Sequence, residues 1–318
     1  MNGAPPTPRS VPRVDVVGVG ANSIDFVYTL PAYPRPEGPF SKLRIAGTER
    51  SPGGQTATVL CACASLGLRT WYVGTISTDD NGRFVRDAMA SRGVDVSGAI
   101  DRSDPNAYAV ILLSEDAGER IVLWDRPAGM TLAAADVPAT VVAGARLVHV
   151  DDVDGDGAIA AGRAGIAAGL PVTSDLEAVK PHTRALLDAV TIPIFAEGVG
   201  EQLSGERDLE SALRKLRKPH MTLLCTTLGA HGASMLASDR FIHQPAFEID
   251  PVDTTGAGDI FRAGFIYALL RGDAPESILR FACAAAAVSC TRRGAINSVP
   301  RLAEVDALAK DVRPRSEP

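Results

Sequence analysis

The chain has 318 residues, of which 46% are apolar and 22% charged, a balance typical of a globular protein with a large core. Its 32 Lys and Arg against 38 Asp and Glu give a net charge of −6 without a long basic run, which disfavours nucleic acid or an anionic membrane as the main partner. The five cysteines are odd in number and lie in mostly apolar surroundings, so they indicate reduced thiols, and neither they nor the five histidines have metal-site spacing.

The ends of the chain differ in composition from its middle. Residues 1 to 13 are polar and Pro-rich without an apolar core, which predicts a disordered tail and not a signal peptide, and residues 311 to 318 form a second polar tail. The longest apolar run, residues 281 to 288, is shorter than the ~20 residues of a membrane span. We therefore expect a cytoplasmic protein with one domain over residues 14 to 310.

The first half of that domain alternates strand and helix patterns. The segment VDVVGVG, residues 14 to 20, is a β-branched run that predicts a buried strand, and TATVLCACASLGL predicts a buried helix closed by Gly67. The segment RTWYVGTIS predicts another strand. It is followed by DDNGRFVRDAMASRGV, which predicts an amphipathic helix capped by Asp79 or Asp80.

Two segments, about residues 26 to 50 and 100 to 125, interrupt this alternation because they lack helical periodicity. The second contains AYAVILLSEDAGERIVLW, two strand-like runs around an EDAGER turn. From ARLVHVDDVDG onward the strand and helix rhythm resumes. We predict an α/β fold of three layers, with a central mostly parallel sheet flanked by helices and a small β-sheet lid, whose edge strands could pair across a homodimer.

The segment DTTGAGDIFRAGF, residues 253 to 265, carries the chemistry. It follows a strand-like FEIDPV run, and DIFRAGFIYALL has a helical pattern, which places Gly256, Ala257 and Gly258 at a helix N-terminus. Small residues there allow close backbone approach, and the free amides and the helix dipole stabilise an anion.

Asp259 directly follows this predicted anion site, and its carboxylate would repel a phosphate that merely rests there. The arrangement suits a phosphoryl group in transfer, with Asp259 accepting the proton of the attacking hydroxyl. The structural alternative is that Asp259 only caps the helix and the glycines only form a tight turn.

The stretch resembles the second signature of the ribokinase-like (PfkB) sugar kinase family, Asp-Thr-x-Gly-Ala-Gly-Asp before an aromatic helix. Residues 51 to 89 resemble its first signature, a Gly-Gly pair before a helix and then Gly-x-Asp-x-x-Gly. The segments VGVGANSIDFV, CTTLGAHGASML and RRGAINSVP are similar to its opening strand, nucleotide-side turn and C-terminal loop, so the resemblance spans roughly residues 14 to 305.

The resemblance implies an ATP- and Mg²⁺-dependent kinase of a sugar hydroxymethyl group, in which Asp259 is the base and Gly256, Ala257 and Gly258 form the anion hole. It further implies that the substrate is bound by Asp25, Gly53, Gly54 and Thr58, and the nucleotide by Thr227 and Gly229. The implied K⁺-binding residues are Asp253, Thr255, Ser289, Gly294 and Ser298.

Three positions depart from the family pattern. Thr58 stands where many relatives have Asn, and Ala196 and Val199 replace the Asn-x-x-Glu linked to Mg²⁺, although Glu197 and Glu201 lie nearby. Four basic residues are either ligands of an anionic sugar or solvated surface charges: Arg35, Lys42, Arg44 and Arg126.

Three functions remain open at this point. We favour a kinase of a ketose or sugar acid over a nucleoside kinase, because the lid segments contain no aromatic cluster to stack a base. A non-catalytic sugar or nucleotide sensor is the alternative of another class. A Rossmann dehydrogenase would use GVGANS, which lacks the full glycine spacing.

Overall fold

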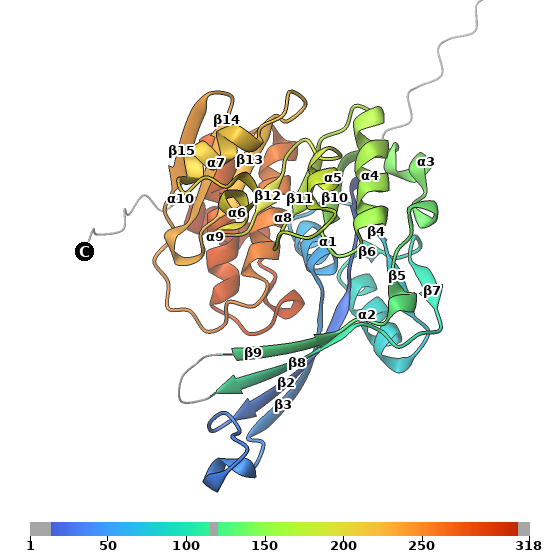
Figure 1. Ribbon diagram of the computed structural model, residues 1–318, viewed down its shortest axis with the longest axis vertical. Helices are drawn as coiled ribbons and strands as arrows, with labels where there is room; N and C mark the ends of the chain where they lie inside the picture. The colour runs from blue at the N-terminus through green and yellow to red at the C-terminus, as the bar shows by residue number, and fades with distance from the viewer. Residues whose placement is uncertain (1–13, 115–119, 311–318) are drawn as a thin grey trace, which may run out of the picture.

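The computed structural model describes residues 14 to 114 and 120 to 310, so both predicted tails lie outside the described residues. Its centre is a sheet of five parallel strands in the order β11-β10-β1-β4-β6 (Figure 1). The strands are β1 (Val14–Val19), β4 (Thr70–Val73), β6 (Val94–Asp95), β10 (Ala145–Asp151) and β11 (Val172–Asp175). Strands β1, β10 and β11 are almost continuously buried, as expected when helices cover both faces of a parallel sheet.

A second group of strands extends this layer beyond β11. Parallel bridges between Thr173 and Ile192 and between Leu176 and Phe195 connect it to the end of β11. Its first two strands also pair parallel, and the remaining strands pair antiparallel. Its members are β12 (Ile194–Phe195), β13 (Leu223–Thr227), β14 (Ala233–Ala237) and β15 (Arg240–Gln244). The central layer is therefore mostly parallel, as predicted.

Helices cover both faces of the central layer, and each face has its own apolar cluster. On one face, side chains such as Val16, Tyr72 and Leu147 pack against α1 (Gln55–Ser65), α2 (Asp80–Ala90), α8 (Ala257–Arg271), α9 (Pro275–Cys290) and α10 (Leu302–Lys310). On the other, Val17 and Val148 pack against α3 (Ala139–Val142), α4 (Gly155–Ala167), α5 (Thr183–Leu187), α6 (Val199–Ser204) and α7 (Leu209–Leu216). The predicted three-layer α/β fold is confirmed.

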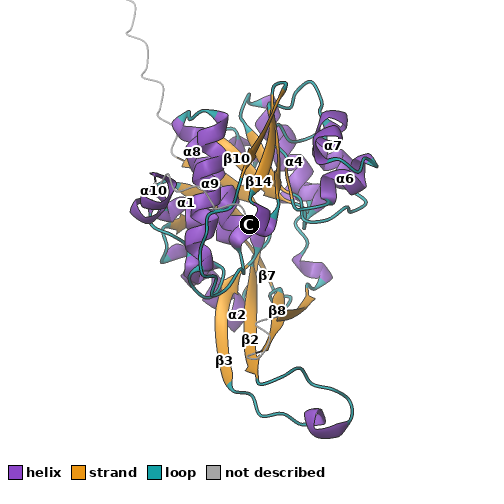
Figure 2. Ribbon diagram, turned by 90° about the vertical axis from the view of Figure 1, so that its left-hand side faces the viewer, coloured by secondary structure: helices purple, strands orange, loops and turns teal. Residues whose placement is uncertain are grey.

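A four-stranded sheet projects from this body, in the order β3-β2-β8-β9 (Figures 1 and 2). It consists of β2 (Ser23–Leu30), β3 (Gly47–Gly53), β8 (Tyr108–Ser114) and β9 (Arg120–Asp125), and the link from β2 to β3 carries the 3₁₀ helix η1 (Gly38–Ser41). The strands come from the two segments predicted to form a small sheet. The predicted EDAGER turn falls on residues 115 to 119, outside the described part of the chain.

Three local predictions need correction. The segment RTWYVGTIS is not one strand, because Gly74 interrupts it and β5 (Thr75–Ser77) pairs with β7 (Ile100–Arg102) in a separate small sheet. A Cβ at Gly74 would lie 2.3 Å from the Gly20 carbonyl oxygen, so the chain turns where only glycine fits. Residues 247 to 252, the strand-like FEIDPV run, form no strand. Segment 100 to 125 also contributes β7 outside the projecting sheet.

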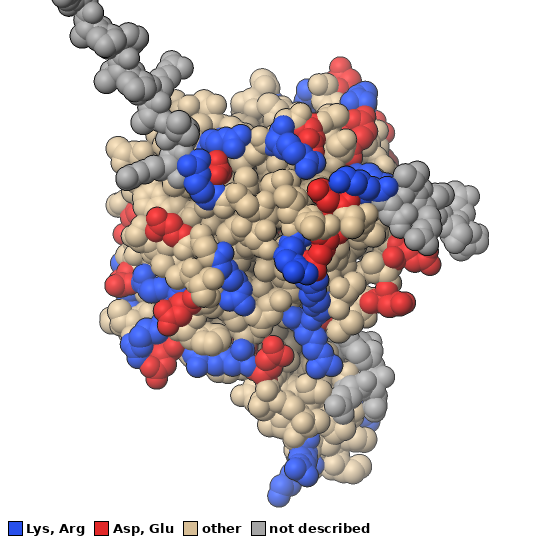
Figure 3. Space-filling view, turned by 180° about the vertical axis from the view of Figure 1, so that it is seen from behind, with Lys and Arg blue, Asp and Glu red and all other residues tan. Residues whose placement is uncertain are grey.

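The surface carries both signs of charge. Basic and acidic side chains are interspersed over the face in Figure 3, as the nearly balanced composition predicts. All five cysteines are buried as free thiols. In the described ranges, every helix is too short or too polar to cross a lipid bilayer.

Candidate active site

The residues predicted to form an anion site, Gly256 to Gly258, lie at the N-terminus of α8. Gly256 precedes the helix with a φ of 74°, a left-handed conformation that favours glycine. Ile260 N donates to Gly256 O at 2.9 Å, the first α-helical bond of the segment, so the amides of Gly258 and Asp259 lie at the open end of the helix. The amide groups and the positive end of the helix dipole together favour an anion at this position.

The loop that carries Gly294 and Ala295 packs against this turn. Asp253 accepts hydrogen bonds from Thr255 N at 2.8 Å, Thr255 Oγ1 at 2.7 Å and Gly294 N at 2.8 Å. A Cβ at Gly256 would lie only 2.8 Å from the Cβ of Ala295, so the turn and the loop are in close contact. Three of the five predicted cation-loop residues are therefore connected directly.

The two serines predicted for the same loop use their hydroxyls locally. Ser289 Oγ donates to Ala286 O within α9 at 2.7 Å, and Ser298 Oγ donates to Ala295 O at 2.9 Å in the 3₁₀ helix η5 (Ile296–Ser298). Both side chains are buried. Their carbonyl oxygens, rather than their hydroxyls, are the groups that they could offer to a cation.

Asp259 lies in the first turn of α8 in an acidic environment. Burial raises the pKa of Asp259 well above its usual value, and the nearby carboxyl of Asp175, at the end of β11, raises it further. The Arg262 guanidinium opposes both effects, and its Nη2 lies 2.6 Å from Asp175 Oδ1. Asp259 is therefore set up to take a proton more readily than an exposed aspartate.

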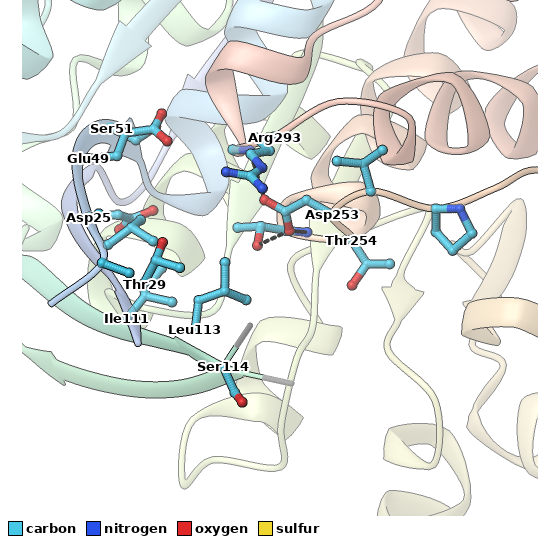
Figure 4. A pocket seen from close by; sticks show the side chains of 17 residues that line it. Asp25, Thr29, Glu49, Ser51, Ile111, Leu113, Ser114, Asp253, Thr254 and Arg293 are labelled. Atoms are coloured by element: carbon cyan, nitrogen blue, oxygen red, sulfur yellow. Dashed lines mark hydrogen bonds between the residues drawn. The ribbon is translucent and has the colours of Figure 1, made fainter. Parts of the chain in front are cut away.

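A large cleft of about 1070 Å³ separates the projecting sheet from the loops beside α8. Figure 4 shows Asp25 and Thr29 on the sheet side, facing Asp253 and Arg293 on the loop side. Its lining is polar and aliphatic and contains these charged residues: Asp25, Glu49, Asp253 and Arg293. Arg293 is exposed, and its sequence neighbourhood did not predict a role for it.

The predicted substrate residues meet at the base of the projecting sheet. Asp25 is 8% exposed and accepts from Ser23 Oγ at 3.2 Å, and it faces Gly53, where a Cβ would lie 2.6 Å from Asp25 Oδ2. Gly54 has a φ of 97°, and a Cβ there would lie 2.4 Å from the Asn22 Cα. Both glycines therefore keep bare backbone beside the carboxylate.

Thr58 lies between the substrate glycines and the anion site. It is fully buried in α1, and its Oγ1 has no hydrogen-bond partner among the described residues. Its Cγ2 would lie 3.5 Å from a Cβ at Gly256. A buried hydroxyl without a partner costs about 1–3 kcal/mol, which a ligand hydrogen bond would recover.

The predicted nucleotide residues lie where β13 ends. Thr227 Oγ1 donates to Phe195 O at 3.4 Å, and Gly229 begins the 3₁₀ helix η4 (Gly229–His231) with a φ of 52°. Glu197 Oε2 would lie 4.0 Å from a Cβ at Gly229, so a carboxylate stands beside this turn. Glu201 is instead in α6, and its buried Oε2 has no hydrogen-bond partner in the part of the chain that the structure describes.

Ala196 and Val199 do not supply oxygen ligands. Val199 is 4% exposed and packs in the apolar cluster on the α4 face of the sheet, with Ala196 against the same cluster. Any carboxylate that contacts Mg²⁺ here must come from other positions, and Glu197, shortly after the end of β12, is an acidic residue beside the turn at Gly229. Carboxylates of this kind suit Mg²⁺, which binds through one or two of them together with nucleotide phosphates.

Arg126 proves to be neither a free ligand for an anionic sugar nor a solvated surface charge. Its side chain is 13% exposed, and its Nη2 lies 2.5 Å from Asp154 Oδ2 and donates to Met130 O at 2.5 Å. Burial raises the pKa of Asp154 to about 6 despite this partner. Arg35, Lys42 and Arg44 are in the exposed link between β2 and β3, outside the residues that line the cleft.

Comparisons with known proteins identify the family of the chain. A family model for the pfkB family carbohydrate kinases matches residues 15–302. Fructokinase-2 of Solanum habrochaites is 27% identical over 93% of this chain and 96% of its own length. A nucleoside kinase of Methanothermobacter thermautotrophicus is 27% identical over 91% of this chain and 94% of its own length.

The fold is also similar to a solved kinase structure. The structure of Arabidopsis thaliana ribokinase complexed with ribose and ATP superimposes with a TM-score of 0.82 at 26% identity, covering 93% of this chain and 99% of that one. The match therefore covers nearly the whole chain rather than one isolated motif.

Proposed function

The chain belongs to the pfkB carbohydrate kinase family and is a phosphotransferase with an alcohol acceptor, and on that premise we propose that it phosphorylates a hydroxymethyl group of a ketose or sugar acid. The observation that carries the proposal is the juxtaposition of the free amides at the start of α8 with Asp259, whose pKa burial raises. The amides would stabilise the transferred phosphoryl group, and Asp259 would accept the proton of the attacking hydroxyl.

When Mg·ATP is bound, ATP would supply the γ-phosphoryl group and Mg²⁺ would neutralise part of the phosphate charge. The bare backbone of Gly256 to Gly258 fits phosphate oxygens, because no Cβ on the glycines blocks approach to the amides. Thr227 and Gly229 would contact the nucleotide at the end of β13, and the Glu197 carboxylate beside Gly229 is our candidate to replace the missing Asn-x-x-Glu near Mg²⁺.

The sugar would lie in the cleft beside Asp25. Its carboxylate can accept hydrogen bonds from sugar hydroxyl groups, and the bare Gly53 and Gly54 backbone leaves room for the sugar to approach closely. The residues that line the cleft include no aromatic side chain, which favours a sugar over the stacked base of a nucleoside. The similarity to a nucleoside kinase keeps that acceptor class as the second candidate.

The projecting sheet would act as a lid. Its strands form one wall of the cleft, so its movement towards the loops beside α8 would exclude water that competes with the sugar hydroxyl. Its edge strand β9 also exposes Ile121 to Trp124, with Trp124 76% exposed. An unpaired apolar edge supports our prediction that two copies pair through this sheet.

The loop around Asp253 is our candidate for a monovalent-cation site. Asp253 already orders Thr255 and Gly294 beside the anion hole, and the carbonyl oxygens of this loop and of the α9 C-terminus are ligands that K⁺ accepts. Turnover with K⁺ in place of an organic cation should then rise. Equal rates would remove the cation from the proposal without touching the kinase reaction.

The test is ADP release from Mg·ATP against ketoses, aldoses, sugar acids and nucleosides, with Asp259→Asn and Asp87→Asn variants in parallel. We expect one sugar class to raise turnover, with a loss of about 10²–10⁴-fold in Asp259→Asn and no change in the exposed Asp87→Asn control. ATP binding without turnover by any acceptor would favour the non-catalytic sensor. Retained turnover in Asp259→Asn would refute the role of the base.

A further inference from the structure

Arg262 is buried although it lies on a helix close to the candidate active site. It follows Asp259 by one turn on α8 and is 2% exposed. Its Nη2 lies 2.6 Å from Asp175 Oδ1 and donates to Ile194 O at 3.3 Å. Asp175 is itself fully buried, and its oxygens receive no hydrogen bond within the described chain beyond this ion pair. Two buried charges of this kind are costly unless they stay paired.

The pair borders both halves of the candidate site. A Cβ at Gly258 would lie 3.0 Å from Arg262 Nη1, so the guanidinium lies against the backbone of the anion hole. On its other side, the guanidinium holds Asp175, and the Asp175 carboxyl lies near enough to Asp259 to raise the pKa of that residue. Arg262 and Asp175 are thus in contact with the proposed machinery without being part of its predicted residues.

The charges around Asp259 explain what the pair does. Burial and the Asp175 carboxylate raise the pKa of Asp259, Glu177 adds to that effect, and Arg262 lowers it. Asp151 and Asp152, at the end of β10, raise the pKa of Asp175 in the same direction. Without the guanidinium, Asp175 and Asp259 would be two adjacent buried carboxyls, which hold one proton between them.

We propose that Arg262 is a positioning residue that neutralises Asp175 and thereby leaves Asp259 ionised and free to accept the proton of the acceptor hydroxyl. The inference rests on the proposed role of Asp259 as the base. A base that shares a proton with its neighbour is blocked, so Arg262 extends the pH range over which the enzyme works. The three residues come from two elements, α8 and β11, that meet only in the folded chain.

The test is the pH profile of kcat/KM in Arg262→Met, Asp175→Asn and the double variant. Arg262→Met removes only the guanidinium and should move the acid limb of the profile to higher pH by about 1–3 units. Asp175→Asn removes only the carboxylate charge and should move the acid limb to lower pH. The double variant removes a neutral pair and should return close to the wild-type limb. The double variant also leaves no unpaired buried charge. If Arg262→Met does not fold, the comparison of the double variant with Asp175→Asn still shows the effect of removing the Arg262 guanidinium.

A second readout does not depend on turnover. In protein labelled with ¹³C at aspartate carboxyls, the Asp259 resonance is identified by its absence from Asp259→Asn, and its NMR titration should shift in the same order. Variants that lose thermal stability but keep the wild-type titration and pH profile would overturn the inference and leave Arg262 a structural residue. An active Asp259→Asn would instead refute the proposed function, so the two failures are distinguishable.

Discussion

The close contact between Gly256 and Ala295 gives a sharp prediction for Gly256→Ala. The new Cβ would lie 2.8 Å from the Ala295 Cβ and 2.9 Å from its Cα, distances at which one of the two segments must move. Its φ of 74° adds about 1–2 kcal/mol of strain for any L side chain. A displacement approaching 1 Å of the amides in the anion hole costs on the order of 10²-fold in rate.

Gly272, at the other end of the same helix, is the matched control. It has a φ of 82°, and a Cβ there would meet nothing within 4 Å. Gly272→Ala should therefore carry the backbone strain alone, lower Tm by a few degrees and leave kcat unchanged. Gly256→Ala should show at least the same loss of Tm and, in addition, a kcat reduced about 10²-fold in the ADP-release assay. Wild-type kcat in both variants would refute the anion hole at this turn.

Further predictions concern the sugar site, pH stability and the projecting sheet. Asp25→Asn should raise the KM of the acceptor about 10–100-fold with little change in the KM of ATP, and equal effects on both would contradict a sugar ligand. Burial raises the pKa of Asp15, but hydrogen bonds led by Arg69 outweigh it and lower that pKa to about 2. The Asp15 carboxylate therefore stabilises the fold above pH ~4 and loses this effect as pH falls through about 2, so Asp15→Asn should lower Tm at pH 7 but converge with wild type near pH 2. Trp124→Glu should convert a dimer to a monomer in sedimentation, whereas Val179→Glu, at another exposed apolar position, should not; a wild-type monomer would remove the proposed interface.

Local sequence patterns were sufficient to predict most of the fold. The β-branched run of β1, the Gly67 cap after α1 and the Asp79 cap of α2 depend on neighbouring residues, and each lies where the sequence indicates. Asp79 accepts from Gly82 N at 2.7 Å. The break at Gly74 could not be predicted in this way, because it depends on Gly20 and Tyr72 in three-dimensional contact.

The same distinction applies to the candidate site: residues of one motif could be predicted from the sequence, and residues paired through the tertiary fold could not. The glycines and Asp259 are contiguous in sequence, so their motif predicts their position at the start of α8. Arg262 fits a helical pattern that says nothing of burial, and its partner Asp175 is on a distant strand. Arg126 looks like a surface cation in sequence, yet Asp154 binds it. Pairs that form only through the tertiary fold carry no local signal.

Phosphoryl transfer itself is the most direct test of the central claim. The acceptor that raises turnover should be recovered after reaction with Mg·ATP and examined by ³¹P NMR with proton coupling. We expect a sugar monophosphate whose phosphorus couples to the two protons of one CH₂ group, formed by wild type and not by Asp259→Asn. Release of inorganic phosphate without a phosphorylated sugar, or phosphate on a secondary hydroxyl, would contradict it.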